Sequence, residues 1–189
     1  MSDKRLRTFL AIAPCQSAIH RLQSYCHTLA PLLPKSLVRW LPPSNWHITL
    51  KFLGNLSPDQ LSGLEQELSH SLRDIHAVSI RLSLIDHFPN NKRPTVIAAL
   101  ADHNPPLNHI AECLSEAASH QGVPVAHKAF RPHISLARYR HKPKHDATQA
   151  LPVPLDPIIF EAHHIQLLRS DTLPTGALYS KLASYPLLT

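Results

Sequence analysis

The chain has 189 residues, of which 43% are hydrophobic and 17% charged, a composition that is typical of a globular protein and excludes a collagen-like chain. No apolar stretch approaches the roughly 18 residues that a membrane helix needs. The first seven residues are polar and basic, and no apolar signal core follows them. We therefore expect a cytoplasmic protein with no membrane segment.

The balance of 19 Lys and Arg residues against 13 Asp and Glu residues gives a net charge of +6, and the chain also carries 15 histidines. This charge is compatible with an anionic partner such as RNA and equally with a basic protein that binds no nucleic acid. The three cysteines (Cys15, Cys26 and Cys113) form no CxxC pair. Free thiols are therefore expected, and neither a disulfide framework nor a cysteine zinc site is indicated.

In the first half of the chain, apolar runs and turn residues predict strands over residues 7–13, 38–41 and 46–53. One helix follows the first strand. A second helix opens at Ser57, because Pro58 suits the first helical position and Gln60 can complete a capping box with Ser57. The apolar stripes of the two helices are Ile19, Leu22, Cys26 and Leu29, and Leu61, Leu64, Leu68 and Leu72.

Apolar runs separated by turn residues also recur in the second half of the chain. Strands are predicted over 78–84, 95–100, 130–138, 160–169 and 177–185. A third helix carries Leu107, Ile110, Ala111, Leu114 and Ala118, and residues 141–157 read as an irregular connection because they contain four prolines. Strands that follow one another directly favour an α+β fold with antiparallel sheets over a doubly wound parallel fold. We expect a single domain over residues 1–189, made of two interleaved lobes.

The most informative feature is a repeated tetrapeptide. His47-Ile48-Thr49-Leu50 recurs as His133-Ile134-Ser135-Leu136, each copy within a predicted strand. Because alternate residues of a strand share a face, histidine and hydroxyl project to one side while isoleucine and leucine face the core. Lys51 is predicted on the face of His47 and Thr49.

Two such strands, related by approximate two-fold symmetry, would bring two imidazoles to one substrate. A neutral His can accept a proton from water while a protonated His donates one to a leaving oxygen. The Thr49 and Ser135 hydroxyls could hold the oxygens of a phosphate and stabilise the charge that develops on it. This chemistry needs neither a metal nor another cofactor.

The repeat and its surroundings resemble the two-histidine (2H) phosphoesterase superfamily, and specifically the LigT-like RNA 2',3'-cyclic phosphodiesterases, also called the 2'-5' RNA ligase family. The resemblance spans nearly the whole chain. It rests on residues 9–12, 39–54, 130–138 and 167–186. It implies a bilobal α+β fold, in which two pseudo-symmetric lobes with antiparallel sheets line a central cleft.

The resemblance also implies an activity: metal-independent hydrolysis of an RNA terminal 2',3'-cyclic phosphate to a 2'-phosphate. By motif position, His47 would be the general acid and His133 the general base, with Thr49 and Ser135 bound to the phosphoryl oxygens. Arg138 matches an arginine that follows the second motif in relatives and would contact the phosphate. Strict alternation places Arg138 opposite His133, so this role requires a bulge near Ala137.

Several alternatives stay open. Phe9 and Phe130 could stack on the terminal base or belong to the core. A 2H protein could instead ligate RNA ends with a 2'-5' bond, act on a small cyclic nucleotide, or bind RNA without catalysis. Zinc binding by His141 with His145, or by His163 with His164, is disfavoured, because Pro143 interrupts the first pair and strand neighbours point to opposite faces. Nothing in the pattern demands more than a monomer.

Overall fold

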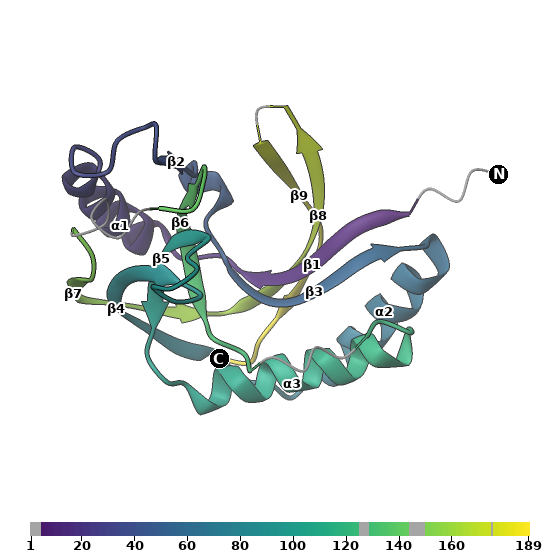
Figure 1. The fold of residues 1–189 in the computed structure, drawn as a ribbon. Helices are drawn as coiled ribbons and strands as arrows, with labels where there is room; N and C mark the ends of the chain where they lie inside the picture. The colour runs from purple at the N-terminus through teal and green to yellow at the C-terminus, as the bar shows by residue number, and fades with distance from the viewer. Residues whose placement is uncertain (1–4, 125–128, 144–149, 175) are drawn as a thin grey trace.

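The computed structural model describes residues 5–124, 129–143, 150–174 and 176–189 (Figure 1). The helices in this part are α1 (Gln16–Leu29), α2 (Pro58–Ser71) and α3 (Pro105–His120), with a 3-10 turn at Pro43–Asn45. The strands are β1 (Leu6–Ile12), β2 (Val38–Trp40), β3 (Ile48–Leu56), β4 (Val78–Phe88), β5 (Val96–Ala101), β6 (His133–Tyr139), β7 (Val153–Ala162), β8 (His164–Leu173) and β9 (Gly176–Pro186). The predicted α+β class is confirmed.

The helix boundaries follow from local chemistry. At the start of α2 the Ser57 hydroxyl accepts from the backbone N–H of Gln60, and the Gln60 side chain accepts from the backbone N–H of Ser57. The predicted capping box is thus present, and it satisfies two N–H groups that a helix start leaves unpaired. At the start of α3 the Asn104 side chain accepts from the backbone N–H of Leu107.

The nine strands form one sheet in the order β7-β4-β5-β6-β3-β1-β8-β9, with β2 paired to β6. Its ladders are antiparallel, and the two central strands, β3 and β6, are joined by a single residue pair, Ile48 with Ile134. The strands on each side of this pair are arranged in the same way, because β1 is the neighbour of β3 on one side and β5 is the neighbour of β6 on the other. The sheet therefore consists of two similar halves that meet at the two predicted motifs.

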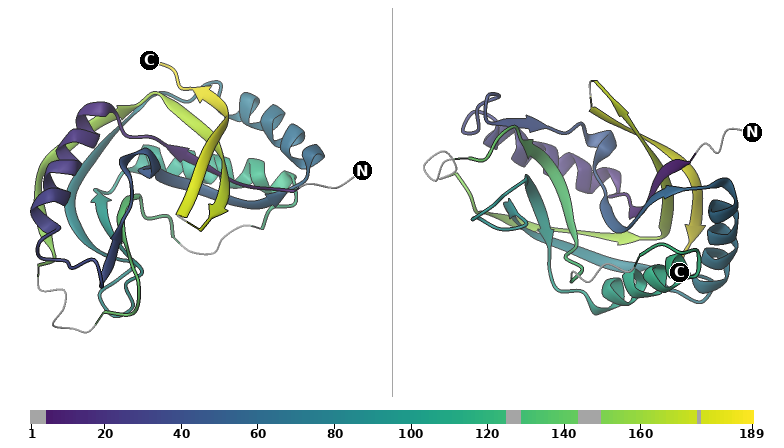
Figure 2. Two further views of the ribbon diagram at one scale, coloured as in Figure 1. Left: turned by 90° about the horizontal axis from the view of Figure 1, so that it is seen from above. Right: turned by 45° about the vertical axis from the view of Figure 1, so that its right-hand side comes forward.

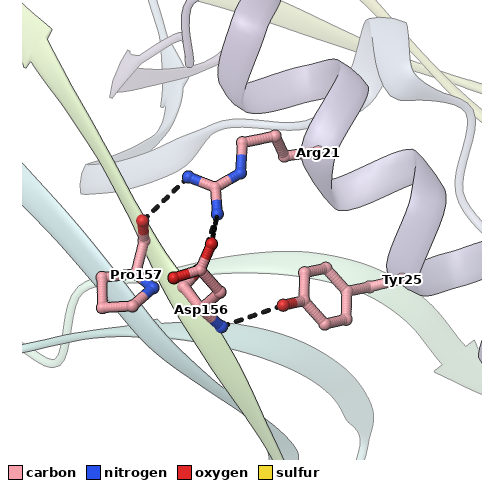
Figure 3. Close-up of polar contacts among 4 residues, drawn as sticks. All are labelled: Arg21, Tyr25, Asp156 and Pro157. Atoms are coloured by element: carbon pink, nitrogen blue, oxygen red, sulfur yellow. Dashed lines mark hydrogen bonds and ion pairs between the residues drawn. The ribbon is translucent and has the colours of Figure 1, made fainter.

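Helices α1 and α3 each pack against the half of the sheet that does not contain the strand preceding them in the chain. Helix α1 follows β1 in the chain but lies beside β7 at the other end of the sheet, whereas α3 follows β5 but packs against β3 (Figures 1 and 2). Figure 3 shows how α1 is fixed: Arg21 donates to the backbone oxygens of Pro157, at 2.8 Å, and of Asp156, at 3.1 Å. The Tyr25 hydroxyl accepts from the backbone N–H of Asp156 at 2.9 Å. Each half of the sheet is thus covered by a helix that follows the other half in sequence.

One hydrophobic core runs under both halves. It includes the buried stripes of the three helices and, from the sheet, Leu10, Ile48, Ile97 and Ile134, each fully buried. The opposite face of the sheet carries a small separate cluster of Phe9, Ala11 and Leu168. We call this second face, on which His47 and His133 lie, the histidine face.

Two predictions about the C-terminal part are wrong. The irregular connection was expected to run through residue 157, but β7 begins at Val153 and includes Pro154 and Pro157. Proline is tolerated there because β7 is an edge strand, which has one side without ladder hydrogen bonds. The single strand predicted over 160–169 is two strands, β7 and β8, separated at His163.

Candidate functional site: two histidines at the centre of the sheet

The two motifs lie side by side where the halves of the sheet meet. Because Ile48 and Ile134 pair antiparallel and both point into the core, the residues on either side of them project from the histidine face. The register sets His47 across from Ser135, and Thr49 across from His133. The face predicted from strand alternation for each of these four side chains is the one that the structure shows.

Both imidazoles are oriented in the same way. Nδ1 of His47 lies 2.8 Å from the backbone oxygen of Asn45, and Nδ1 of His133 lies 2.8 Å from that of Arg131. A carbonyl can only accept a hydrogen bond, so Nδ1 is the protonated nitrogen of each neutral ring. Within the described residues no hydrogen bond engages either Nε2, which leaves this atom available for proton transfer in both rings.

Aromatic side chains hold the two rings. His47 contacts Phe9, with ring centres 4.9 Å apart, and the edge of Tyr179, with ring centres 5.2 Å apart and planes at 86°. His133 stacks on Phe88 with ring centres 3.7 Å apart, and the Arg131 guanidinium lies 5.0 Å from the centre of the Phe88 ring. The predicted site lacks Phe88 and Tyr179, because no local pattern links β4 or β9 to the motif strands.

Burial favours the neutral form of both histidines in the unliganded protein. Burial is the main reason that the pKa of His47 is lowered to about 4, against an ordinary value of 6.5, and electrostatic interactions with His133 and Arg138 contribute to this lowering. Burial also lowers the pKa of His133, and the charge of Arg131 adds to that effect. Both rings are thus neutral at pH 7, and His133 and Arg138 lie close enough to His47 to influence its pKa.

A β-bulge brings Arg138 to the histidine face. Ala98 pairs with Ser135 and the preceding residue Ile97 pairs with Ala137, so Leu136 is an extra residue in β6. After the bulge Ala137 points into the core and Arg138 to the other side, where it pairs with Val96. The bulge that the proposed role of Arg138 required is therefore present.

The equivalent bulge in β3 corrects the placement of Lys51. Ala11 pairs with Thr49 and Leu10 with Lys51, so Leu50 is the extra residue. Lys51 consequently lies on the core face, 6% exposed, with its Nζ 3.3 Å from the backbone oxygen of Pro124. Lys51 does not share the face of His47 and Thr49 that strand alternation predicts, because the extra residue shifts the alternation by one position.

The two phenylalanines considered for base stacking differ in their surroundings. Phe9 is 3% exposed and packs against both His47 and Tyr179. Phe130 precedes β6, where a strand was predicted, and it packs against the main core. Phe9 is thus covered by its neighbours, whereas Phe130 is partly exposed and lines a cavity with Phe88 and Arg131, so its stacking role stays a prediction.

Two cavities flank the histidines. One, of about 260 Å³, lies beside His47 and is lined by Arg39, Asn45, Arg138 and Tyr179 among others. The other, of about 200 Å³, lies beside His133 and is lined by Phe88, Phe130 and Arg131 among others. The larger cavity combines two guanidinium groups with an aromatic ring and suits an anionic, aromatic ligand.

The remaining sequence-based expectations concern metal ligands and membrane helices. In the described part of the chain, no three His, Cys, Asp or Glu side chains come together in a group that could hold a metal ion. Of the histidines considered for zinc, His163 lies 3.5 Å from a Glu161 carboxylate oxygen, and His145 falls outside the described residues. Within the described ranges no helix has both the length and the apolar composition needed to cross a bilayer.

The sequence resembles known phosphoesterases. The model of the LigT-like phosphoesterase family matches residues 12–98. The RNA 2',3'-cyclic phosphodiesterase of Thermus thermophilus is 32% identical over 155 residues, which cover 78% of this chain and 74% of that protein. The protein of the same name from Bacillus subtilis is 32% identical over 100 residues, 53% of this chain, and the match spans only 55% of that relative.

The fold resembles solved structures over almost its full length. The crystal structure of TT0787 from Thermus thermophilus has a TM-score of 0.84 at 24% identity and covers 96% of this chain and 98% of that one. The structure of LigT from E. coli complexed with 3'-AMP has a TM-score of 0.77 at 22% identity and covers 98% of this chain and 99% of that one. These likenesses establish the fold.

Proposed function

The chain belongs to the LigT-like phosphoesterase family, and from this premise we propose that it hydrolyses RNA terminal 2',3'-cyclic phosphates to 2'-phosphates by acid–base catalysis with His47 and His133. Relatives that carry the name RNA 2',3'-cyclic phosphodiesterase support the hydrolytic activity. The paired histidines on one face, each with an Nε2 to which no described residue is hydrogen-bonded, support the mechanism. No metal or other cofactor takes part in the proposed reaction.

His133 acts as the general base. Its Nε2 takes a proton from a water molecule as the water oxygen attacks phosphorus, and the bond from phosphorus to the 3' oxygen breaks. The neutral state of His133 suits this step, because a base must begin without its proton. Arg131 favours the neutral form, and stacking on Phe88 fixes the plane of the ring.

His47 acts as the general acid and donates its Nε2 proton to the departing 3' oxygen. With a pKa of about 4 in the free protein, His47 is neutral at pH 7 and must gain a proton when substrate binds. A phosphodiester carries a negative charge, and this charge beside a half-buried imidazole raises its pKa. Substrate binding and protonation of His47 are therefore coupled, and the pair titrates with macroscopic pKa values.

The remaining groups of the site bind the phosphate. The Thr49 and Ser135 hydroxyls lie on the histidine face across from the two imidazoles and donate to the non-bridging phosphate oxygens. Arg138 contributes a fixed positive charge, close enough to His47 to lower its pKa. Together these donors stabilise the charge that builds up on the phosphorane-like transition state.

The observation that carries the proposal is the matched geometry of the two motifs, in which both imidazoles have Nδ1 bonded to a backbone oxygen and lie at the centre of one sheet. The test is to incubate the purified protein, in EDTA, with a short RNA that ends in a 2',3'-cyclic phosphate and to identify the product by phosphorus NMR. The proposal predicts a 2'-phosphate. A 3'-phosphate would contradict the roles assigned to the two histidines, and binding without turnover would contradict the enzymatic function.

A further inference from the structure

The residue two positions before each motif histidine makes two contacts, one from its backbone and one from its side chain. Asn45 precedes His47 in this way, and its backbone oxygen lies 2.8 Å from Nδ1 of that ring. The Asn45 side chain donates from Nδ2 to the backbone oxygen of Ala177 in β9, at 2.8 Å. One residue thus connects an imidazole of β3 to β9, which lies three places away in the sheet.

The second motif repeats this arrangement. Arg131 lies two residues before His133, and its backbone oxygen is 2.8 Å from Nδ1 of that ring. The Arg131 guanidinium donates to the backbone oxygen of Pro89, directly after β4, at 2.7 Å. Strand β4 lies two places from β6 in the sheet. We call these two side-chain contacts, of Asn45 with Ala177 and of Arg131 with Pro89, the tethers.

Each tether ends beside the aromatic ring that contacts the same histidine. Tyr179 lies two residues after the acceptor of the first tether, and its ring meets the His47 ring edge-on, with centres 5.2 Å apart. Phe88 directly precedes the acceptor of the second, and its ring stacks on His133 with centres 3.7 Å apart. Each set of contacts is therefore closed: it runs from the imidazole through the tether to a distant strand and back through an aromatic ring.

The two acceptors lie near the ends of hairpins that come from opposite halves of the sheet (Figure 1). Pro89 directly follows the last residue pair of β4 with β5, and Ala177 belongs to the pair next to the end of β8 with β9. The ends of hairpins are the least restrained parts of a sheet, because few ladder contacts hold them. A side chain that fixes such an end also fixes the aromatic residue beside it.

We propose that Asn45 and Arg131 are positioning residues, whose side chains hold the two hairpins so that Tyr179 and Phe88 fix the planes of the catalytic imidazoles. The inference rests on the proposed function. A single hydrogen bond at Nδ1 fixes one atom of a ring, whereas an aromatic ring packed against the imidazole also restricts its tilt. Both restraints are needed, because Nε2 must come within about 2.6–3.2 Å of the atom with which it exchanges a proton.

The test removes each tether and leaves the backbone oxygen that accepts from Nδ1. Asn45→Ala and Arg131→Leu should each lower kcat about 10- to 10²-fold, because a misplaced catalytic group loses its near-attack geometry. KM should change less than about twofold, since the groups that bind the phosphate remain. Arg131→Lys keeps a cation that can donate to the same oxygen, and it should retain more of kcat than Arg131→Leu.

Two control variants remove the same kinds of contact elsewhere in the fold. Arg21→Leu removes a guanidinium that donates to a backbone oxygen at 2.8 Å, and Gln60→Ala removes an amide that donates to one at 2.8 Å. Both residues lie at helices, α1 and α2, and neither lines the two cavities beside the histidines. The control variants should lose stability and keep wild-type kcat, which separates positioning from general loss of structure.

A change of leaving group assigns each tether to one histidine. With sulfur in place of the bridging 3' oxygen, the departing thiolate needs no proton, so a misplaced general acid costs little rate. Asn45→Ala should then recover most of its activity, whereas Arg131→Leu, in which the base is misplaced, should stay impaired. Equal losses by the two variants on both substrates, or wild-type kcat in both variants, would overturn the inference.

A second readout does not depend on turnover. In NMR spectra the nuclear Overhauser contact between the Tyr179 and His47 rings should be lost in Asn45→Ala and kept in Arg131→Leu. The contact between the other aromatic ring and its histidine should show the opposite pattern. Absence of hydrolysis by the wild type refutes the proposed function. The ring contacts then decide on the tethers alone: loss of the matching contact supports their role, and contacts kept in both variants refute it.

Discussion

Because the pKa of His47 is lowered in the folded protein, the free energy of unfolding depends on pH. Replacing His47 by a residue that does not titrate should remove this contribution. In the unfolded chain the imidazole has a pKa near 6.5, whereas in the folded protein burial, together with interactions with His133 and Arg138, lowers this pKa to about 4. As pH falls, the unfolded state therefore binds the proton first. Folding stability is lost as pH drops below about 6.5, and the loss is complete below about pH 4.

The size of this effect follows from the two pKa values. Between pH 8 and pH 5 the linkage relation gives a loss of about 2 kcal/mol that is due to His47 alone. In His47→Gln the side chain does not titrate, so the variant should lose about 2 kcal/mol less stability than wild type over this range. Urea unfolding at pH 8, 6.5 and 5, followed by circular dichroism, measures the difference.

A control variant and a direct measurement of the protonation state complete the test. His20→Gln removes an exposed imidazole from α1 and should stay within about 0.5 kcal/mol of wild type at each pH, as surface substitutions usually do. Nitrogen NMR of the His47 ring should show Nδ1 protonated and Nε2 bare at pH 7. Equal losses of stability in wild type and His47→Gln would refute the argument that burial holds His47 neutral.

The other predictions concern the site. Ser135→Ala should lower kcat about 10²-fold or more, because a donor to the transition state is lost, with the fold intact by circular dichroism. Phe88→Ala removes the ring on which His133 stacks and should lower kcat with little change in KM, as steady-state kinetics would show; an effect confined to KM would contradict the positioning role. Arg138→Gln should weaken binding of a nucleotide 2'-phosphate and raise the pKa of His47, both readable in one NMR titration, and an unchanged pKa would contradict the contact.

The placement of the candidate site residues could be predicted from the sequence, because it depends on local periodicity. Alternation along a strand is a property of the backbone, so a repeated His-Ile-Thr/Ser-Leu fixes which side chains share a face. The capping box of α2 was predictable for the same reason, since Ser57 and Gln60 are one helical turn apart. The packing of Phe88 on His133 depends instead on how distant strands are arranged in the sheet.

The bulges could be predicted only in part, because they shift local alternation but show themselves in the pairing with distant strands. The role implied for Arg138 required an extra residue in β6, and the structure has it at Leu136. In β3 the matching bulge at Leu50 turns Lys51 into the core and Phe52 outward, whereas simple alternation predicts the reverse. A bulge leaves no sequence mark of its own here, so it becomes predictable only when one repeat is compared with the other.

The start of β7 was predicted wrongly because the segment contains prolines. Pro154 and Pro157 favour a loop when the segment is considered alone, since proline cannot donate to a ladder. Within the sheet β7 is an edge strand, and side chains of α1 satisfy its backbone near Asp156. That partner comes from the first thirty residues of the chain, and no pattern within β7 reveals it.

The central claim is that His47 donates a proton to the departing 3' oxygen while His133 activates water. It is tested most directly with a substrate in which sulfur replaces the bridging 3' oxygen, because a thiolate leaves without being protonated. On the oxygen substrate, His47→Ala and His133→Ala should each lose about 10²- to 10⁴-fold in rate. On the sulfur substrate, the account predicts that His47→Ala regains most of its activity and that His133→Ala stays impaired. Recovery of His133→Ala in place of His47→Ala would contradict it.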